Sequence, residues 1–476
     1  MRGDEDTETT PPARITVCIS VNPEWGGVLP TFPLARALRD AGHRVIYAGP
    51  PPCEFLLEGR KIPWHRIVGC IEDAGYEFYQ VARGLLAASA DSDALTAMEC
   101  AYTDAVSDCA ALVREQAIDL LLLDPFIWFA AIGAARQGVP VLSIKTNLRA
   151  RINAHVPPST SHFVPDGSLA SRLRILGAWL AIFAQWTVLS WFHPPSRRLL
   201  RFVRKTGRDG RRVGLRLAVS DFHPEFVLPE VTLCPRSFDF AAVPGRVYVG
   251  TMDDARGGEP FAWPAGPGSR RIYCTAGTMT NDFEDYTRRF VDACVGAAAL
   301  DPELSMVVQV PRGFWPAAAL VPDNVALREW VPQCSALNAA DLAVVAGGLG
   351  TIKECILAGT PPVVVSPPHA DKPGNAARVA YHELGARLPA AELSPRRLAR
   401  AIDQVWASRD RHRTNMAAIQ HEMRDPAVAR RFVEMVERVA RDHADQRRAA
   451  RLRGAPPASL RRTRRRTPSD SSSTGT

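Results

Sequence analysis

Residues 342–366 read LAVVAGGLGTIKECILAGTPPVVVS, and this stretch decides the fold class. Its first four residues form an uninterrupted apolar run, which is typical of a strand buried on both faces of a parallel sheet. A glycine-rich turn follows at residues 347–351, and then an apolar helix that we expect to begin near Ile352. The next strand is Pro362–Ser366. Strand, glycine turn, helix and strand in this order predict a parallel α/β sheet.

The same alternation of strands and helices extends along both halves of the chain. In the first half, a β-branched strand runs into a loop that carries Gly26 and Gly27 between prolines. This rhythm implies two doubly wound α/β domains in series. The further predicted elements are the strands Ile15–Val21, Arg44–Ala48, Asp119–Asp124, Val139–Ile144, Arg271–Cys274, Met306–Gln309 and Ala326–Arg328, and helices at Phe32–Ala41 and before Ala134.

The 476-residue length fits two domains with appendages. Residues 14–254 are predicted to form the N-terminal domain and residues 271–445 the C-terminal domain with terminal helices. The Gly- and Pro-rich residues 255–270 are predicted to link them. We expect residues 1–13 and the Arg-rich residues 446–476 to be disordered.

Composition excludes several classes of protein. Hydrophobic residues make up 46% and charged residues 23%, which is ordinary for a globular chain and excludes a collagen-like or polytopic membrane protein. Residues 446–476 hold nine arginines and one aspartate, so this tail accounts for the whole net charge of +8. A general nucleic-acid-binding surface, and thus a specific nucleic-acid partner, is not expected.

The cysteines and the N-terminus indicate the compartment. The ten cysteines include no C-x-x-C pair and no histidine at metal-site spacing, so we expect reduced, mostly buried thiols and no metal site. Residues 1–12 are acidic and lack an apolar run, unlike a secretory signal. The sequence therefore predicts a cytoplasmic protein.

The segment Ile175–Phe192 is eighteen residues long and almost entirely apolar. Three interpretations are open: a buried or cleft-lining helix, an interfacial membrane helix, or a membrane-spanning helix at the lower limit of length. A basic cluster follows it, which suits either an anionic lipid surface or a solvated helix face. The cluster consists of Arg197, Arg198, Arg201, Arg204 and Lys205.

Four features around the glycine turn together describe a nucleotide-sugar pocket. Trp330 is an aromatic ring for a base, Glu354 a carboxylate for ribose hydroxyls, and Asp371 a carboxylate for sugar hydroxyls. The helix N-terminus after the turn favours a diphosphate. Taken singly, each has a structural interpretation, since Trp330 suits a core, Glu354 a helix surface and Asp371 a loop cap.

The run from Trp330 to Val379, with WVPQ, the glycine turn, AGTPPVVV, and Asp371 before Asn375, resembles the donor box of nucleotide-sugar-dependent glycosyltransferases of the GT-B fold. This group includes bacterial macrolide and plant secondary-metabolite enzymes. Residues 26–38 and 123–126 also resemble the family's first loop and helix and its acceptor-side strand end. The resemblance implies two Rossmann-like domains facing across a cleft and an enzyme of bacterial secondary metabolism. The donor-binding residues it implies are Gly277, Thr278, Trp330, Gln333, Gly347, Gly348, Gly350, Thr351, Glu354, Asp371 and Lys372.

Three positions depart from the family pattern. Gly27 stands where the family has the histidine that removes the acceptor proton, which leaves Asp124, Glu24 or no residue at all as the base. Ala346 replaces a histidine that contacts the diphosphate, a loss of about 1.5–3 kcal/mol. Lys372 replaces a glutamine that reads sugar hydroxyls. Its ammonium would pair with an acidic sugar, pair with the phosphates, or face solvent without contact.

These expectations combine into one activity and one alternative. The leading hypothesis is an inverting hexosyltransferase that moves a sugar from a UDP-sugar, or a dTDP-sugar, to an apolar small-molecule or lipid-like acceptor, with no metal and no cofactor beyond the donor. If the acceptor is lipid-like, we expect the protein to contact the inner face of the membrane peripherally. The alternative is a catalytically impaired GT-B-fold binding or partner protein. The acceptor cleft is predicted to include Gly26, Gly27, Trp179 and Trp186.

Overall fold

The computed structural model describes most of the chain, and every structural statement below refers to that part. The described residues are 14–21, 25–48, 64–65, 92–192, 194–221, 224–241, 246–250, 260–277, 283–316 and 321–452. The predicted N-terminal disorder, Glu24, Thr278, the first five residues of the predicted linker (255–259) and residues 453–476 lie outside it.

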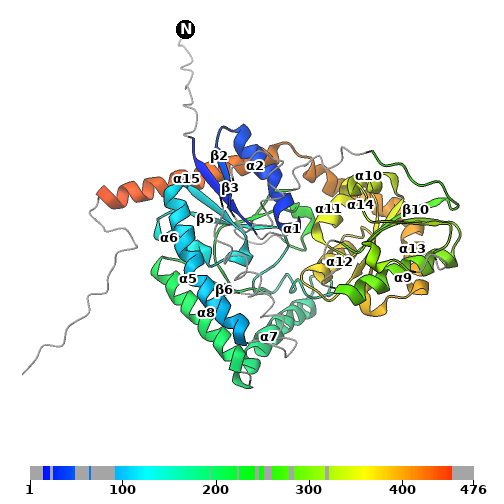
Figure 1. The fold of residues 1–476 in the computed structure, drawn as a ribbon, viewed down its shortest axis with the longest axis horizontal. Helices are drawn as coiled ribbons and strands as arrows, with labels where there is room; N and C mark the ends of the chain where they lie inside the picture. The colour runs from blue at the N-terminus through cyan, green and yellow to red at the C-terminus, as the bar shows by residue number, and fades with distance from the viewer. Residues whose placement is uncertain are drawn as a thin grey trace, which may run out of the picture.

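The first half of the chain folds around a parallel sheet (Figure 1). Seven described strands lie in the order β3-β2-β1-β4-β5-β8-β9. A separate antiparallel pair, β6 and β7, lies near β8 in the sequence. The strands are β1 (Thr16–Ser20), β2 (Arg44–Ala48), β3 (Trp64–His65), β4 (Leu120–Leu123), β5 (Val141–Lys145), β6 (Leu217–Val219), β7 (Pro224–Phe226), β8 (Glu230–Thr232) and β9 (Arg246–Tyr248).

The second half repeats the design with a parallel sheet of six described strands. Their order, β12-β11-β10-β13-β14-β15, starts from the middle and winds outward in both directions, as in doubly wound folds. The strands are β10 (Arg270–Thr275), β11 (Leu304–Gln309), β12 (Val325–Arg328), β13 (Leu342–Val345), β14 (Pro362–Ser366) and β15 (Ala386–Pro389).

Helices cover both faces of each sheet and produce the two-lobed shape seen in Figure 1. Those of the first half are α1 (Trp25–Val28), α2 (Phe32–Asp40), α5 (Ser92–Glu115), α6 (Ala130–Arg136), α7 (Leu169–Phe192) and α8 (Pro194–Arg212). Those of the second half are α9 (Glu284–Leu300), α10 (Gln333–Ala339), α11 (Leu349–Ala358), α12 (Lys372–Tyr381), α13 (Pro395–Ala407), α14 (Arg409–Met423) and α15 (Ala427–Leu452).

The predicted strands are confirmed to within two residues at each end, because their apolar runs are buried on both faces. Two local predictions are wrong. The loop after β1 becomes helical at Trp25, and α11 begins at Leu349 rather than near Ile352. In both places glycines join the first turn of a helix, since a glycine with a helical backbone is costly but permitted.

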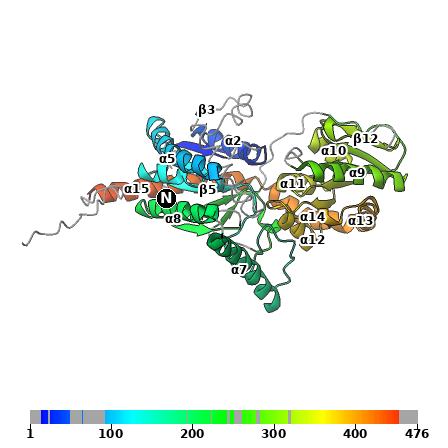
Figure 2. The same cartoon turned by 60° about the horizontal axis from the view of Figure 1, so that its bottom comes forward.

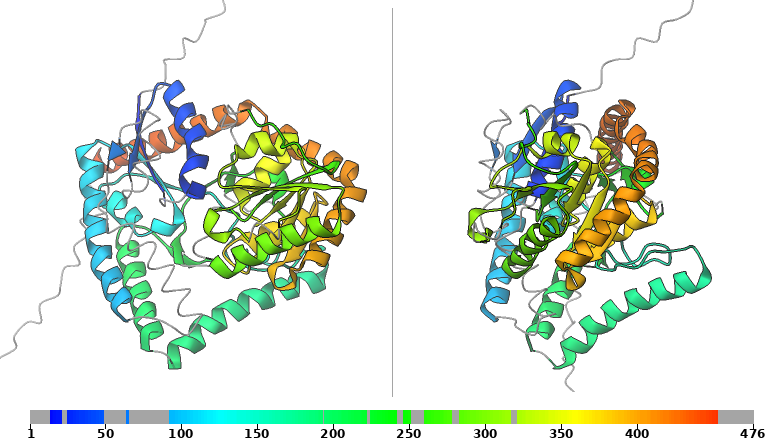
Figure 3. Two further views of the ribbon diagram at one scale, coloured as in Figure 1. Left: turned by 45° about the vertical axis from the view of Figure 1, so that its right-hand side comes forward. Right: turned by 90° about the vertical axis from the view of Figure 1, so that its right-hand side faces the viewer.

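The last helix returns to the first half of the molecule. Phe432 and Val436 of α15 pack in one buried cluster with Val17, Leu34 and Leu122, and α15 runs beside α2 in two views (Figures 1 and 3). This packing extends α15 to Leu452, so the predicted disorder does not begin at residue 446. The helix was assigned from sequence to the C-terminal domain, but its apolar face is buried on the N-terminal one.

Buried polar contacts join the two halves. The guanidinium of Arg378 on α12 donates to Asp239 Oδ1 from Nη2 at 2.7 Å, and both side chains are almost fully buried. The backbone N–H of Gly374 donates to the carbonyl of Ser159 at 2.8 Å. A Cβ at Gly374 would lie 2.5 Å from that oxygen, so only glycine permits this approach. Helix α12 is therefore held against the N-terminal half.

Helix α7 is only partly buried. Ile175 and Trp179 are nearly inaccessible, whereas the opposite side of the helix is exposed. The helix projects from the body of the molecule (Figures 2 and 3). Among the described residues, no helix is long and apolar enough to cross a membrane. The prediction of a buried helix thus holds for one face of α7 only.

Candidate donor and acceptor sites

The glycine turn after β13 has the geometry of an anion cradle. Gly347 has φ of +90°, a value that L side chains rarely adopt. An added Cβ there would lie 3.0 Å from Val364 Cγ1 and 3.3 Å from the carbonyl oxygen of Lys372. Gly348 is the N-cap of α11, and the first N–H groups of that helix lack intrahelical acceptors. The turn therefore presents backbone donors and the positive end of the helix dipole.

Gln333 and Glu354 are brought together beside this turn. The amide Nε2 of Gln333, at the start of α10, donates to Glu354 Oε2 on α11, and lies 3.4 Å from Thr351 Oγ1. The Tyr273 hydroxyl lies 2.6 Å from Gln309 Oε1 and 3.1 Å from Gln333 Oε1. This network fixes the Glu354 carboxylate near the end of β10. Tyr273 and Gln309 were not predicted, although both lie in strands that the sequence identified.

Trp330 lies three residues before Gln333 and keeps 71% of its surface exposed. A tryptophan used for the core would be buried, so the core interpretation of Trp330 is wrong. The exposed indole offers a flat face on which a nucleobase can stack.

Asp371 is held at the opposite edge of the turn. Asn375 Nδ2 donates to Asp371 Oδ2 and to the carbonyl of Gly347, both at 3.0 Å. Burial raises the pKa of Asp371, and the Asn375 amide and the Lys372 charge act in the opposite direction. The preceding Ala370 has φ of +51°, a strained value for a residue with a Cβ. Asn375 therefore ties the predicted sugar-binding aspartate to the predicted diphosphate turn.

The Lys372 ammonium lies over the ring of Phe283, 5.6 Å from its centroid. That ring also packs against His369, with centroids 4.4 Å apart. Of the three alternatives for Lys372, the one without any contact is therefore wrong. Its backbone neighbours Gly347, which places its base close to the diphosphate turn.

Gly277, at the end of β10, has φ of +86°, and a Cβ there would lie 3.9 Å from Ala346 Cβ. The loops that follow β10 and β13 thus meet, as predicted for a shared diphosphate site. Thr278, the other predicted residue of this loop, lies outside the described residues.

The acceptor-side residues lie at the end of the first sheet. Asp124 follows β4 directly, and its N–H donates to the Ser20 carbonyl at the end of β1. Its buried carboxylate accepts from the Phe126 N–H at 2.8 Å as the cap of a short turn. Gly26 and Gly27 lie in α1, which follows β1, and a Cβ at Gly26 would meet nothing within 4 Å.

Trp179 is 2% exposed and donates from Nε1 to the Val156 carbonyl at 3.1 Å. It packs in a cluster with Ile175 and with Ala377 of α12. In this structure it anchors α7 between the two halves and is not exposed to an acceptor. The side chain of Trp186 lies outside the described part.

Sequence reasoning missed two buried charged residues between the halves. The backbone N–H of Ser159 donates to Asp221 Oδ2 at 2.6 Å, and burial raises the pKa of Asp221. Arg149 is fully buried, and its charge opposes the rise in pKa of both Asp221 and Asp371. Arg149 is four residues beyond β5, so a charge just past the carboxyl end of a predicted strand was the available signal.

Cysteine burial agrees with the sequence where it can be assessed. Six described cysteines are buried and Cys334 is partly so, all as free thiols. Within the described ranges, no group of three or more potential metal ligands is found.

Comparisons with known proteins point to one group. Residues 293–440 match the family of erythromycin biosynthesis protein CIII-like C-terminal domains. The 4'-demethylrebeccamycin synthase of Lentzea aerocolonigenes is 25% identical over 429 residues, which is 85% of this chain and 95% of that protein. The tylactone mycaminosyltransferase of Streptomyces fradiae is 26% identical, covering 96% and 98%. A solved structure of the glycosyltransferase VinC with dTDP matches with a TM-score of 0.58 at 18% identity, covering 90% and 100%.

Proposed function

The chain belongs to the nucleotide-sugar-dependent glycosyltransferases of the GT-B fold, in the group of the macrolide enzymes, and from this premise we propose its reaction. It transfers a hexose, with inversion, from a UDP-sugar to a hydroxyl of an apolar small molecule. The dTDP-sugars are the second donor class, since a structure of the same fold holds dTDP.

The observation that carries this proposal is the arrangement around β13. The exposed Trp330 and Gln333 come from the connection between β12 and β13, and the turn at Gly347 and Glu354 come from the next connection, between β13 and β14. They offer a face for a base, a carboxylate for ribose and N–H donors for a diphosphate, which are the groups that a nucleoside diphosphate carries.

The same turn supplies the chemistry of the leaving group. As the bond between sugar and diphosphate breaks, negative charge grows on the diphosphate, and the N-terminus of α11 is oriented to stabilise it. We assign the Lys372 ammonium to this anion. The Lys372 ammonium would take the place of the histidine that the resemblance predicted at Ala346. The backbone of Lys372 lies beside Gly347.

Inversion requires the acceptor oxygen to attack from the side opposite the diphosphate, with a base to remove its proton. We assign this role to Asp124. It stands at the carboxyl end of β4, where ligands of parallel α/β sheets bind, and α1, which follows β1, carries no titratable side chain. The proton passes from the acceptor hydroxyl to the carboxylate as the new glycosidic bond forms.

The test is calorimetric binding of UDP, dTDP, UDP-glucose and UDP-glucuronic acid to the full-length protein. We expect Trp330→Ala to weaken nucleotide binding about 10- to 100-fold, since one stacked base contributes about 1–3 kcal/mol. Trp330→Phe keeps an aromatic face and is the matched control. If no nucleotide binds the folded protein, or if Trp330→Ala binds as well as the parent, the donor site is elsewhere.

Turnover separates the enzyme from the catalytically impaired alternative. Donor hydrolysis or transfer by the parent protein supports the enzyme. Tight donor binding without turnover, with activity that arises only in Gly27→His, would support a binding protein that has lost its base.

A further inference from the structure

The hairpin formed by α7 and α8 combines two surface features that the proposed reaction does not use. Five large apolar side chains of α7 are between 47% and 73% exposed. With 3.6 residues per turn, their spacing confines them to a stripe about 140° wide. The buried Ile175 and Trp179 lie outside this stripe. The stripe consists of Leu169, Leu173, Leu180, Phe183 and Val188.

Helix α8 is strongly basic on one side. Its residues 194–212 carry eight cations and a single carboxylate, Asp209, which pairs with Arg212 at 3.1 Å. The cations also fall within about 140° of the helix circumference, while Phe202 and Thr206 are buried on another side. They are Arg197, Arg198, Arg201, Arg204, Lys205, Arg208, Arg211 and Arg212.

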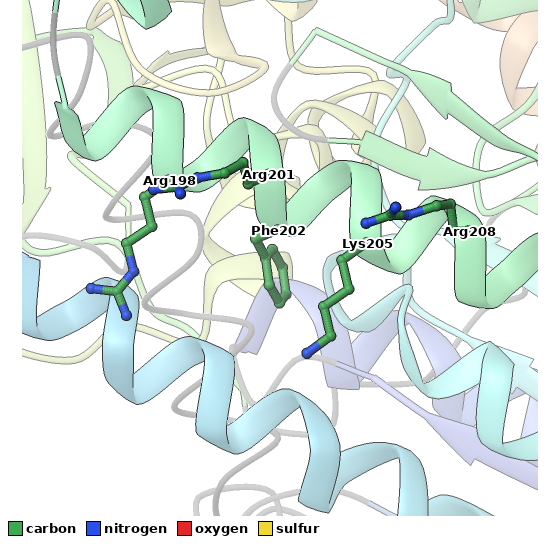
Figure 4. Close-up of a pocket in the computed structure, with 5 residues that line it drawn as sticks. All are labelled: Arg198, Arg201, Phe202, Lys205 and Arg208. Carbon is green, nitrogen blue, oxygen red and sulfur yellow. The ribbon is translucent and has the colours of Figure 1, made fainter.

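An open cavity lies along part of this basic side of α8. Arg198, Arg201, Lys205 and Arg208 line an open cavity of about 410 Å³ together with Phe202. In Figure 4 the side chains of Arg198, Phe202 and Lys205 extend from α8 toward α5. Several cations around one open cavity suit an anionic headgroup, because guanidinium groups bind phosphate oxygens bidentately.

We propose that the α7–α8 hairpin docks on an anionic phospholipid bilayer, with the apolar stripe of α7 entering the interface and the cations of α8 binding lipid phosphates. The two helices are consecutive in the chain and in contact, and α7 projects from the body of the molecule whereas α8 lies beside α5 (Figures 1 and 3). An apolar face beside a basic face is the pattern of interfacial helices. The proposal does not depend on the reaction proposed above.

Charge argues against the other occupants. A symmetric contact between two copies that used both helices would bring two basic faces into one interface, where like charges repel. A nucleic acid would satisfy the cations but would leave the apolar stripe of α7 in water. An anionic bilayer would neutralise the cations of α8 and also remove the apolar stripe of α7 from water.

The test is co-sedimentation of the full-length protein with vesicles of phosphatidylcholine, alone or mixed equally with phosphatidylserine. We expect binding to the mixed vesicles that weakens as salt is raised, since screening shortens the reach of the cations. Arg201→Gln with Arg204→Gln should lower the partition coefficient about 30-fold, because each surface cation contributes about 1 kcal/mol. Leu180→Ser with Phe183→Ser should lower it about tenfold or more.

Matched controls carry equivalent changes elsewhere. Arg396→Gln with Arg400→Gln removes two exposed cations from α13, and Leu300→Ser removes an exposed leucine from α9. Neither should change vesicle binding. All variants keep residues 446–476, so binding carried by that arginine-rich tail would persist in every one of them.

Three results would overturn the proposal. Equal binding to neutral and mixed vesicles would remove the role of the cations, and binding insensitive to both hairpin variants would place the contact elsewhere. A dimer that dissociates on Leu180→Ser with Phe183→Ser, in a protein that binds no vesicles, would identify a second copy as the occupant. Thermal unfolding of each variant confirms that it is folded.

Discussion

The proposed donor end of the second sheet and the proposed acceptor end of the first stand at the carboxyl ends of parallel strands, yet they are built differently. At the proposed donor end, hydrogen bonds pair Gln333 with Glu354 and Asn375 with Gly347, and each pair is less than thirty positions apart in the chain. At the acceptor end, Asp124 caps its own turn and the facing helix offers glycines.

This difference separates two kinds of recognition. A diphosphate can be bound by backbone N–H groups and a helix terminus, which a short sequence motif encodes completely. A proton acceptor requires one side chain at a defined place, and here Gly27 stands where the resemblance predicted a histidine. The donor end should therefore depend on backbone shape, and the acceptor end on a single charge.

The largest expected effect is the fall in kcat when the Asp124 carboxylate is removed. Asp124→Asn keeps an oxygen to cap the Phe126 N–H but removes the base, so we expect kcat to fall by about 100- to 10,000-fold. Donor binding should be unchanged, because the proposed donor contacts lie on the other sheet. Steady-state transfer rates and calorimetry measure the two. An unchanged kcat would exclude Asp124 and favour Glu24.

The next effect concerns the junction of the two regions. Asp239→Asn leaves the buried guanidinium of Arg378 without its counter-charge, and we expect a loss of about 3–5 kcal/mol in unfolding free energy. Chemical denaturation measures this loss. Surface pairs such as Arg430 with Glu434 provide the control, because Glu434→Gln should cost less than about 1 kcal/mol.

The loss of stability in acid should also depend on the Arg378–Asp239 pair. Burial alone would raise the pKa of Asp239, but the charges of Arg378 and Arg246 outweigh it and lower the pKa. The stabilisation is complete above the unfolded value of about 3.9 and is lost as the pH falls through the lower, folded pKa. Asp239→Asn should lack this component of the acid dependence. If Asp239→Asn loses stability with falling pH to the same extent as the parent, the acid dependence does not come from Asp239.

Lys372→Gln tests which part of the donor the Lys372 ammonium binds. If the ammonium binds the diphosphate, UDP, UDP-glucose and UDP-glucuronic acid should all bind about 10- to 100-fold more weakly, as for a lost charge-assisted hydrogen bond of about 1.5–3 kcal/mol. If it reads an acidic sugar instead, calorimetry will record weakening for UDP-glucuronic acid alone.

A pair of glycines gives the smallest effects. Gly347→Ala forces a Cβ into a positive φ against Val364, and we expect donor affinity to fall about tenfold, from about 1–2 kcal/mol of strain. Gly26→Ala adds a Cβ where nothing lies within 4 Å, so donor affinity should stay as it is and the short helix should be slightly stabilised. Equal losses in both would mean that the two ends do not differ in their dependence on backbone shape.

The sequence predicted the strands and the glycine turn of the second sheet closely because their information is local. Continuous apolar runs identify buried strands, and Gly347 marks a turn that only glycine adopts readily. It failed for α15 and α7, whose apolar residues could be assigned to a helix but not to a partner. The same limit applies to Arg149 and Asp221, since a buried charge is recognisable only when its opposite charges are placed around it.

The sequence by itself determined the two parallel sheets, the order of their strands' apolar runs and the residues of the donor turn, because each depends on neighbours a few positions away. Only the tertiary structure decided that Asn375 ties Asp371 to the glycine turn, that Arg378 and Asp239 hold the two halves together, and that one side of α7 is left exposed. The Asn375 contact joins two different connections of the sheet, the Arg378–Asp239 pair joins segments 139 residues apart, and the exposure of α7 depends on which face of the helix is buried. Folding alone brings such groups into contact.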